Sequence, residues 1–335
     1  MGRVVASSPG KITLFGEHAV VYGYPAIVVA IDRKVYVTAE ARGDDSVRIN
    51  AQDLRTPGVI VSMSNGEIQV TTDYGKTLSA IGYLSKAIEL TAEFLGVRRG
   101  VNLEVRSEMP VGAGLGTSAA VSVATIAAYS SCLGYELSKE DIARLGWEVE
   151  KNVQGLASPM DTSIATFGGV LKIWFEGNAI HRVPINVGGD PTFVIAYVER
   201  ERSTRDMVLW VKNLRDRHPD LVNGILEHIG KVTLEAEKAL PAGDLAEVGI
   251  LMNINHGLLD ALGVSTRRLN EVIYIARVAG ALGSKLTGGG GGGASVALTR
   301  PDSAETLTNV LKLITPQVFK AEINAEGVTV ERLQS

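Results

Sequence analysis

The feature that most constrains the fold is a glycine-rich segment, Pro110–Ala120, which reads Pro-Val-Gly-Ala-Gly-Leu-Gly-Thr-Ser-Ala-Ala. A predicted strand, Val101–Val105, precedes it, and an alanine-rich predicted helix, Ala119–Tyr135, follows it. Glycines at alternate positions let the backbone adopt left-handed torsions and approach a ligand closely. The segment therefore predicts a tight strand-to-helix connection whose main chain can line a binding site.

The chemistry favoured by this connection is anion binding. Thr117 and Ser118 open the predicted helix, whose first N–H groups have no partner and carry about half a positive charge. Such a helix start is suited to phosphate groups. The spacing differs from the P-loop and from the dinucleotide fingerprint. A tight turn that binds nothing is the alternative for this segment taken alone.

The length of 335 residues predicts two domains, because single hydrophobic cores rarely grow so large. Strand-like segments dominate the first half, and one long helix is predicted at Thr77–Leu95. The second half is rich in helices, predicted at residues 207–216, 218–239, 243–262 and 269–281. Because Gly and Pro gather near Asn186–Asp190, we predict an α+β protein with domains at residues 1–185 and 186–335.

Composition excludes several classes of function. The net charge of −4 argues against a nucleic-acid partner, which requires clustered Lys and Arg. The single cysteine, Cys132, and five scattered His residues argue against a disulfide framework and structural zinc. The longest apolar stretch contains Ser122 and Thr125 and is a better candidate for a buried helix than for a membrane span. We therefore expect a cytoplasmic protein with no membrane partner.

A second segment with chemical groups is Pro9–His18, which reads Pro-Gly-Lys-Ile-Thr-Leu-Phe-Gly-Glu-His. Lys11 stands in an apolar strand context and would be costly to bury unless an anion pairs with it. Glu17 and His18 lie between Gly16 and the apolar Ala19–Val21. A solvated turn is the alternative interpretation for Glu17 and His18.

Two carboxylates, Glu150 and Asp161, flank a predicted bend at Gly155–Pro159. Glu150 lies beside the apolar stripe of a helix that begins with the capping-box-like Ser138–Asp141. Carboxylates at such a bend can divide into a metal ligand and a proton acceptor. A helix N-cap is the alternative for Asp161.

The fourth segment is a run of six glycines, Gly288–Gly293, between Ser284–Thr287 and Ala294–Thr299. A flexible linker is one interpretation of such a run. The flanking residues are strand-like and apolar, which favours a glycine loop between packed strands, in close approach to another loop or to phosphate.

These segments together resemble three motifs of the GHMP kinase superfamily, which includes galactokinases, homoserine kinases and phosphomevalonate kinases. Pro9–Tyr22, Pro110–Ala120 and Lys285–Gly293 are similar to its first, second and third motifs, in order and across almost the whole chain. The closest resemblance is to the mevalonate kinase family, through residues 10–23, Arg202–Asp206 and residues 253–265. The chain departs from the family pattern at Gly289, where Ala is usual, and at Ser158–Asp161, where many members read Pro-Ser-Gly-x-Asp.

The resemblance implies a fold and a set of ligands. An N-terminal domain like ribosomal protein S5 domain 2 and a ferredoxin-like C-terminal domain would enclose the active site, with ATP and Mg²⁺ as cofactors. The phosphates would be wrapped by Pro110, Gly112, Ala113, Gly114, Leu115, Gly116, Thr117 and Ser118. A homodimer is a further expectation.

The resemblance also implies roles for single residues. Ser118 and Glu150 would hold the metal, and Asp161, with Lys11 beside it, would accept the proton of the C5 hydroxyl of mevalonate. Glu17, His18 and Thr204 would lie near that substrate. Phosphomevalonate, galactose and homoserine remain alternative acceptors. A galactokinase-like sensor without turnover and a diphosphomevalonate decarboxylase are further alternatives, against which Lys11 and Glu150 argue.

Overall fold

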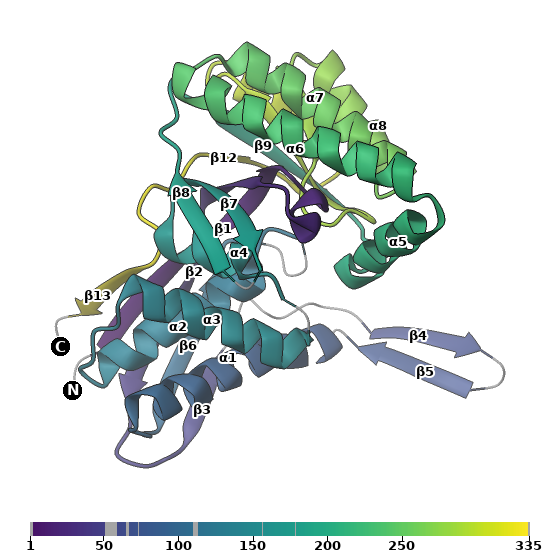
Figure 1. Ribbon diagram of the computed structural model, residues 1–335. Helices are drawn as coiled ribbons and strands as arrows, with labels where there is room; N and C mark the ends of the chain where they lie inside the picture. Colours follow the sequence, from purple (N-terminus) through teal and green to yellow (C-terminus); the bar gives the residue numbers. More distant parts are fainter. Residues whose placement is uncertain are drawn as a thin grey trace.

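The structure is a computed structural model that describes residues 3–50, 59–64, 67–72, 74–109, 113–155, 157–177 and 179–333. The chain forms two lobes (Figure 1). One lobe contains the larger sheet with helices α1 to α4, and the other contains a smaller sheet with helices α6 to α9. The predicted mixture of helices and sheets is confirmed.

The larger sheet brings together strands from both ends of the chain. Its strands, as far as the chain is described, are β1 (Arg3–Phe15), β2 (Ala26–Ala41), β3 (Val47–Asn50), β6 (Val101–Ser107), β7 (Val170–Glu176), β8 (Ala179–Pro184) and β13 (Thr329–Leu333). The order is β13-β1-β2-β6-β3, with β7 paired to both β2 and β8. Only the β3–β6 pair among these is parallel. Strand β2 runs unbroken from Ala26 to Ala41, although its β-branched residues predict two strands, Ile27–Ile31 and Val35–Ala39, so that prediction is wrong at residues 32–34.

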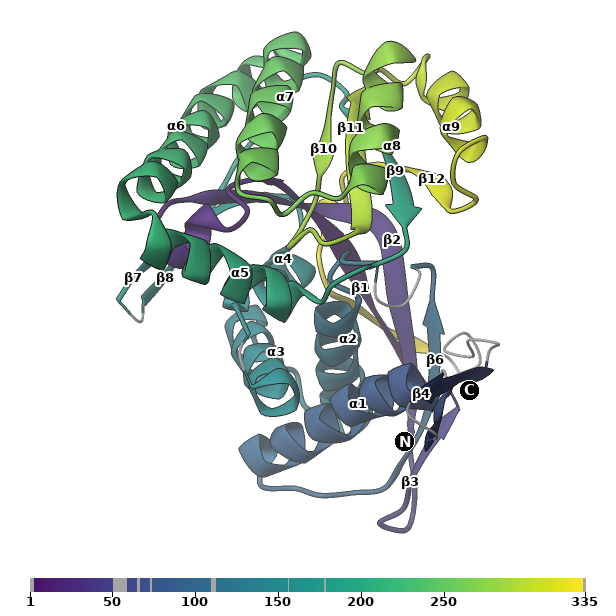
Figure 2. The same cartoon turned by 90° about the vertical axis from the view of Figure 1, so that its right-hand side faces the viewer.

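Helices cover one side of this sheet (Figure 2). They are α1 (Tyr74–Leu95), α2 (Thr117–Cys132), α3 (Lys139–Gln154) and α4 (Pro159–Phe167). Two further elements lie in the first half of the chain: a separate hairpin of β4 (Val59–Ser64) and β5 (Glu67–Thr72), and the short 3₁₀ helix η1 (Ala19–Tyr22). Helix α2 is buried from Ala119 to Cys132, as expected for a helix that is apolar on all sides. The predicted cap of α3 is confirmed, since the Ser138 hydroxyl accepts a hydrogen bond from the Asp141 N–H at 3.1 Å.

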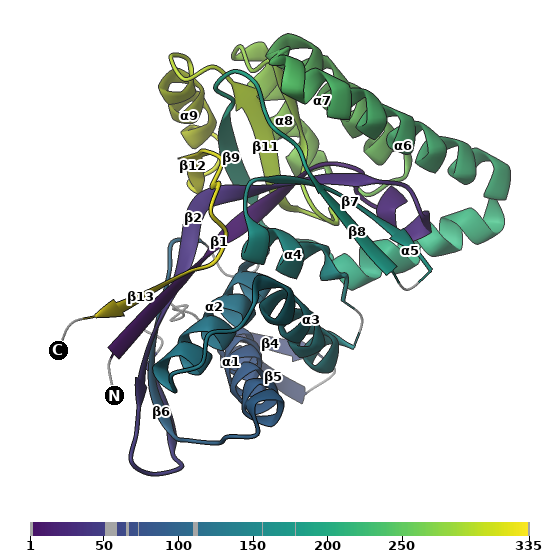
Figure 3. The same cartoon turned by 60° about the vertical axis from the view of Figure 1, so that its left-hand side comes forward.

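The second lobe is an antiparallel sheet covered by helices (Figure 3). Its strands are β9 (Thr192–Val198), β10 (Gly283–Leu286), β11 (Gly293–Thr299) and β12 (Val318–Ala321), in the order β10-β11-β9-β12. Its helices are α5 (Thr204–Arg217), α6 (Pro219–Ala242), α7 (Leu245–Ala261), α8 (Arg267–Val278) and α9 (Ala304–Lys312). The sequence predicts the first four of these helices but not α9, whose buried Leu307 and Leu311 make only one apolar repeat.

The end of β1 connects the two lobes. Thr13 donates its N–H to the Thr287 hydroxyl at 2.8 Å, and that hydroxyl donates to the Thr13 carbonyl at 3.0 Å. The glycine run joins β10 to β11, and Gly290–Gly293 are buried. The linker interpretation is therefore wrong, and the prediction of a packed glycine loop is confirmed. Because β1 carries the first motif, this connection brings the first and third motifs together.

Candidate active site

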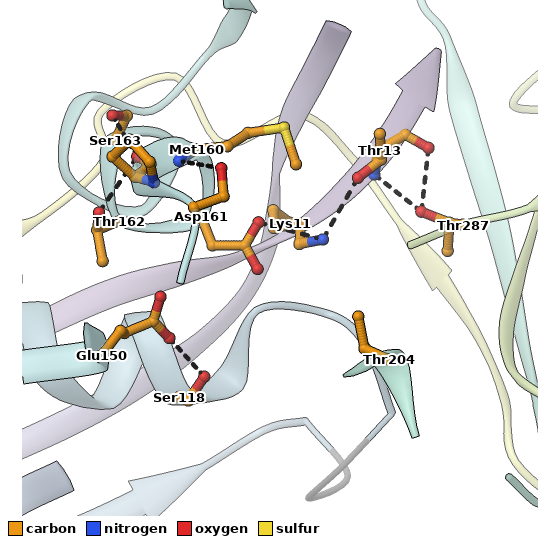
Figure 4. A network of polar contacts seen from close by, with 12 residues as sticks. Lys11, Thr13, Ser118, Glu150, Met160, Asp161, Thr162, Ser163, Thr204 and Thr287 are labelled. Carbon is orange, nitrogen blue, oxygen red and sulfur yellow. Dashed lines mark hydrogen bonds and ion pairs between the residues drawn. The ribbon is translucent and has the colours of Figure 1, made fainter. Parts of the chain in front are cut away.

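Lys11 and Asp161 meet at the start of helix α4. Lys11 lies on β1, and its Nζ is 3.3 Å from the Asp161 Oδ1 and 3.3 Å from the Thr13 hydroxyl (Figure 4). The Lys11 side chain is 6% exposed and that of Asp161 is 28% exposed. The carboxylate is thus held by a buried cation and still reaches solvent.

The local structure of α4 explains the position of Asp161. Ser158 is the N-cap, accepting from the Met160 N–H at 3.2 Å, and Pro159 occupies the first turn. Asp161 therefore lies in the first turn without serving as the cap, so the N-cap interpretation of its side chain is wrong. A helix N-terminus is a favourable position for a negatively charged side chain.

Ser118 and Glu150 form a second pair close by. The Ser118 hydroxyl donates to the Glu150 Oε1 at 2.7 Å, joining the start of α2 to α3 (Figure 4). Burial, with a smaller contribution from the charge of Asp161, raises the pKa of Glu150 to about 8, although the hydrogen bond from Ser118 and the charge of Lys11 oppose this shift. Glu150 is therefore a buried carboxyl group that keeps its proton near neutral pH unless a cation binds beside it.

This donor set fits Mg²⁺. Hard cations prefer oxygen ligands, and Mg²⁺ is usually held by one or two carboxylates together with water and substrate phosphates. Glu150 and Ser118 supply a carboxylate and a hydroxyl, and the hydroxyl of Thr117 is buried without a hydrogen-bond partner. No group of three or more His, Cys, Asp or Glu side chains suited to a metal occurs in the described ranges, so we expect water and phosphate oxygens to supply the other ligands.

The glycine loop passes beside the Lys11 side chain. Gly114 and Gly116 have φ angles of 83° and 72°, in the left-handed region that disfavours other residues. A Cβ on Gly116 would lie 2.8 Å from the Lys11 Cγ. The Lys11 N–H also donates to the Leu115 carbonyl at 2.8 Å. The first and second motifs are therefore in direct contact.

The described residues of the predicted phosphate-binding loop, 113–118, lie at the start of α2. Gly116 precedes α2 without a side-chain cap, so the N–H groups of its first turn are free to bind an anion. Ala113 and Leu115 are buried, and Gly114, Thr117 and Ser118 are partly exposed. Pro110 and Gly112 lie outside the described residues.

Glu17 and His18 contact the third motif. The Glu17 carboxylate pairs with Lys285 and accepts a hydrogen bond from the Asn255 amide at 3.0 Å. His18 has a φ of 61°, and its Nε2 lies 3.0 Å from the Gly289 carbonyl. Burial lowers the pKa of His18, although the bond to Gly289 opposes this. Glu17 is thus fully engaged by protein groups, and Lys285 is a partner that sequence reasoning missed.

Thr204 approaches the site from helix α5 (Figure 4). It is the first residue of α5, directly after the N-cap Ser203 of the Ser203–Asp206 capping box, and it is exposed. Its methyl group lies against the glycine run, since a Cβ on Gly289 would be 2.7 Å from the Thr204 Cγ2. This contact gives a physical reason for glycine at position 289.

Comparisons with known proteins agree with this geometry. Family models match residues 82–169 (GHMP kinases N terminal domain), 236–313 (GHMP kinases C terminal) and 2–41 (galactokinase galactose-binding signature). The chain is 43% identical to mevalonate kinase of Pyrococcus abyssi, over 99% of this chain and 98% of that protein. It is 44% identical to that of Thermococcus gammatolerans, over 99% of both.

Solved structures give the same result. The crystal structure of Leishmania major mevalonate kinase in complex with R-mevalonate matches with a TM-score of 0.83 at 26% identity, covering 95% of each chain. The Methanococcus jannaschii enzyme matches with a TM-score of 0.79 at 29% identity, covering 96% of this chain and 98% of that one. The chain therefore belongs to the GHMP kinases, and among them to the mevalonate kinase family.

Membership of this family makes the chain an ATP-using phosphotransferase and confirms the predicted two-domain fold class. Among the described helices, none combines the length and the apolar character that crossing a bilayer requires.

Proposed function

We propose that this chain transfers the γ-phosphate of ATP to the C5 hydroxyl of mevalonate. The supporting observation is the Lys11–Asp161 pair, a buried ammonium and a partly exposed carboxylate beside the glycine loop. Phosphoryl transfer passes through a loose transition state, so the protein mainly positions the reactants and neutralises charge. The residues of the site supply these two functions.

Asp161 is the proposed proton acceptor. Its exposed fraction of 28% allows a substrate hydroxyl to reach it, and positioned proton transfer typically contributes about 10²–10⁴-fold. Lys11 holds this carboxylate in place and offers its ammonium to the alkoxide that develops, or to the γ-phosphate. Both groups come from regular elements, β1 and α4, which fixes their relative position.

The phosphates are assigned to residues 110–118. The N–H groups at the start of α2 and the left-handed glycines provide donors that need no reorganisation. Ser118 and Glu150 are proposed to hold Mg²⁺, which when bound would neutralise phosphate charge during transfer. Glu150 would then lose the proton that burial favours.

The substrate assignments extend to three further residues. Thr204, exposed at the start of α5, is proposed to contact mevalonate directly. His18 and Glu17 are buried, so we propose that they act by shaping the floor of the substrate site. We also propose domains at residues 1–185 and 186–335, with β13 returned to the first sheet. A homodimer and a cytoplasmic location stay predictions.

A coupled assay of ADP release with Mg²⁺ and ATP tests this function. Mevalonate, galactose, homoserine and phosphomevalonate are offered as acceptors in parallel, with galactose included because residues 2–41 match a galactose-binding signature. We expect mevalonate to give the highest kcat/KM by far. A higher value with another acceptor would replace the proposal, and no ADP release with any acceptor would favour a non-catalytic sensor.

A further inference from the structure

Arg200 lies between the two glycine loops of the site. It follows strand β9, and its guanidinium group packs against backbone from both loops. A Cβ on Gly114 would lie 2.5 Å from the Arg200 Nη2, and a Cβ on Gly293 would lie 3.1 Å from its Nε. A side chain at either position would crowd this cation where it now lies.

The guanidinium has no anionic partner among the residues that the structure describes. Its Nη1 donates to the Thr204 hydroxyl at 3.0 Å, and its Nε is shielded from solvent with no hydrogen-bond partner. Glu199 and Glu201 are adjacent in sequence, but both are exposed and neither forms an ion pair with it. Burial lowers the pKa of Arg200. A partly buried cation without an anion carries a desolvation cost, and an anionic ligand would offset it.

Arg200 and Lys11 pack on the same glycine loop. The Lys11 side chain packs on Gly116 and the Arg200 guanidinium packs on Gly114, two residues earlier in the same loop. Two residues span at most about 7 Å of extended chain. Two cations that pack on loop residues this close together can act on the same polyphosphate chain.

We propose that Arg200 binds the polyphosphate of the nucleotide, as a second cation beside Lys11. This inference rests on the proposed function, because it takes the glycine loop as the phosphate site. A polyphosphate is favoured over the carboxylate of the acceptor because the guanidinium contacts Gly114 and Gly293, which belong to the loops. A planar guanidinium also forms paired, charge-assisted hydrogen bonds with phosphate oxygens.

Nucleotide binding to Arg200→Gln, measured by calorimetry without any acceptor, tests the proposal. ATP, ADP and AMP are titrated in magnesium buffer into the unmodified chain, Arg200→Gln, Arg200→Lys and the control Arg217→Gln. Arg217 is an exposed arginine at the far end of α5. We expect Arg200→Gln to bind ATP and ADP about 10- to 100-fold more weakly, the usual effect of losing a charged hydrogen bond. AMP should be nearly unaffected, and Arg200→Lys should be intermediate.

The outcomes separate this inference from the function on which it rests. Melting curves first establish that the variants are folded. If the unmodified chain binds ATP and the folded Arg200→Gln variant binds it equally well, the Arg200 assignment is wrong and the proposed function stands. A rise in KM for mevalonate with unchanged ATP affinity would reassign Arg200 to the acceptor and also overturn the proposal. If the unmodified chain binds no ATP, the proposed function itself fails.

Discussion

Two lysine–carboxylate pairs join the first motif to other parts of this chain, and they differ in their access to solvent. The Lys285–Glu17 pair has side chains 0% and 2% exposed. Lys285 also donates to the Leu286 carbonyl at 2.6 Å, and Asn255 donates to Glu17 at 3.0 Å. In the pair formed by Lys11 and Asp161, the carboxylate is 28% exposed and the two charged atoms are 3.3 Å apart.

This difference in solvent access indicates which of the two pairs can take part in catalysis. A pair closed on all sides by protein donors and acceptors has no position left for a substrate, and its main consequence is structural. It ties the turn that follows β1, which carries Glu17, to β10 of the second lobe. The open pair has a buried cation and a reachable carboxylate, which is the arrangement that proton transfer needs. Replacing each lysine separately should therefore have different consequences.

The largest effect is expected from Lys285→Met. Removing one partner of a buried pair leaves the Glu17 charge uncompensated, which typically costs about 3–5 kcal/mol of unfolding free energy. Denaturant unfolding measures this loss. The double variant Glu17→Gln/Lys285→Met should recover part of it, and Lys238→Met, in an exposed ion pair, should change stability by about 1 kcal/mol or less. A stable Lys285→Met protein would contradict the structural role of the closed pair.

Lys11→Met should act mainly on turnover. Losing one preorganised donor to a developing negative charge typically costs about 10²–10³-fold in kcat. Its partner Asp161 can be hydrated when the cation is removed, so we expect a smaller loss of unfolding free energy than in Lys285→Met. Steady-state kinetics and denaturant unfolding on both variants give the contrast. Equal stability losses with normal turnover in Lys11→Met would remove the distinction between the two pairs.

Gly116→Ala should disturb the open pair from the loop side. The new Cβ would meet the Lys11 Cγ at 2.8 Å and displace its ammonium, and small misplacements of reacting groups cost about 10- to 100-fold in rate. Gly134→Ala is the matched control, because Gly134 also has a positive φ, of 90°, but no atom within 4 Å of its Cβ. If both variants lose the same activity, backbone strain rather than Lys11 explains the effect.

The smallest effect concerns the pH dependence of stability in protein stripped of divalent cations. Because the pKa of Glu150 is raised from 4.5 to about 8, the folded state keeps a proton that the unfolded state has lost. Its contribution to stability is full below about pH 4.5 and is lost as the pH rises to about 8. In Glu150→Gln, the melting temperature should depend less on pH across this window. Glu148→Gln, in the partly exposed ion pair with Arg144, is the control and should keep the pH dependence of the unmodified protein. A Glu150→Gln curve that parallels the unmodified protein would contradict the raised pKa.

Local patterns allowed much of the site to be predicted. Glycines at alternate positions before an apolar helix, and a lysine that needs an anion, are visible within a few residues of sequence. They predicted the loop at Gly116 and the need of Lys11 for a partner. The Lys11–Asp161 contact itself joins residues far apart in the chain, and it was reached through the resemblance to a family.

The features that could not be predicted from the sequence depend on contacts between residues far apart in the chain. Lys285 and Glu17 are 268 positions apart and meet only once both lobes are assembled. Arg200 carries no local signal, because its meaning comes from glycines in two other segments. Strand β13 at Thr329–Leu333 is short and partly exposed, and only its pairing with β1 makes it a strand.

The most direct test of Asp161 as proton acceptor is transfer of labelled γ-phosphate to mevalonate by the Asp161→Asn variant at saturating ATP. The account predicts that nucleotide binds this variant as it binds the unmodified chain, while transfer slows by at least about 100-fold. Transfer at a near-normal rate would contradict it, because the C5 hydroxyl would then lose its proton without this carboxylate.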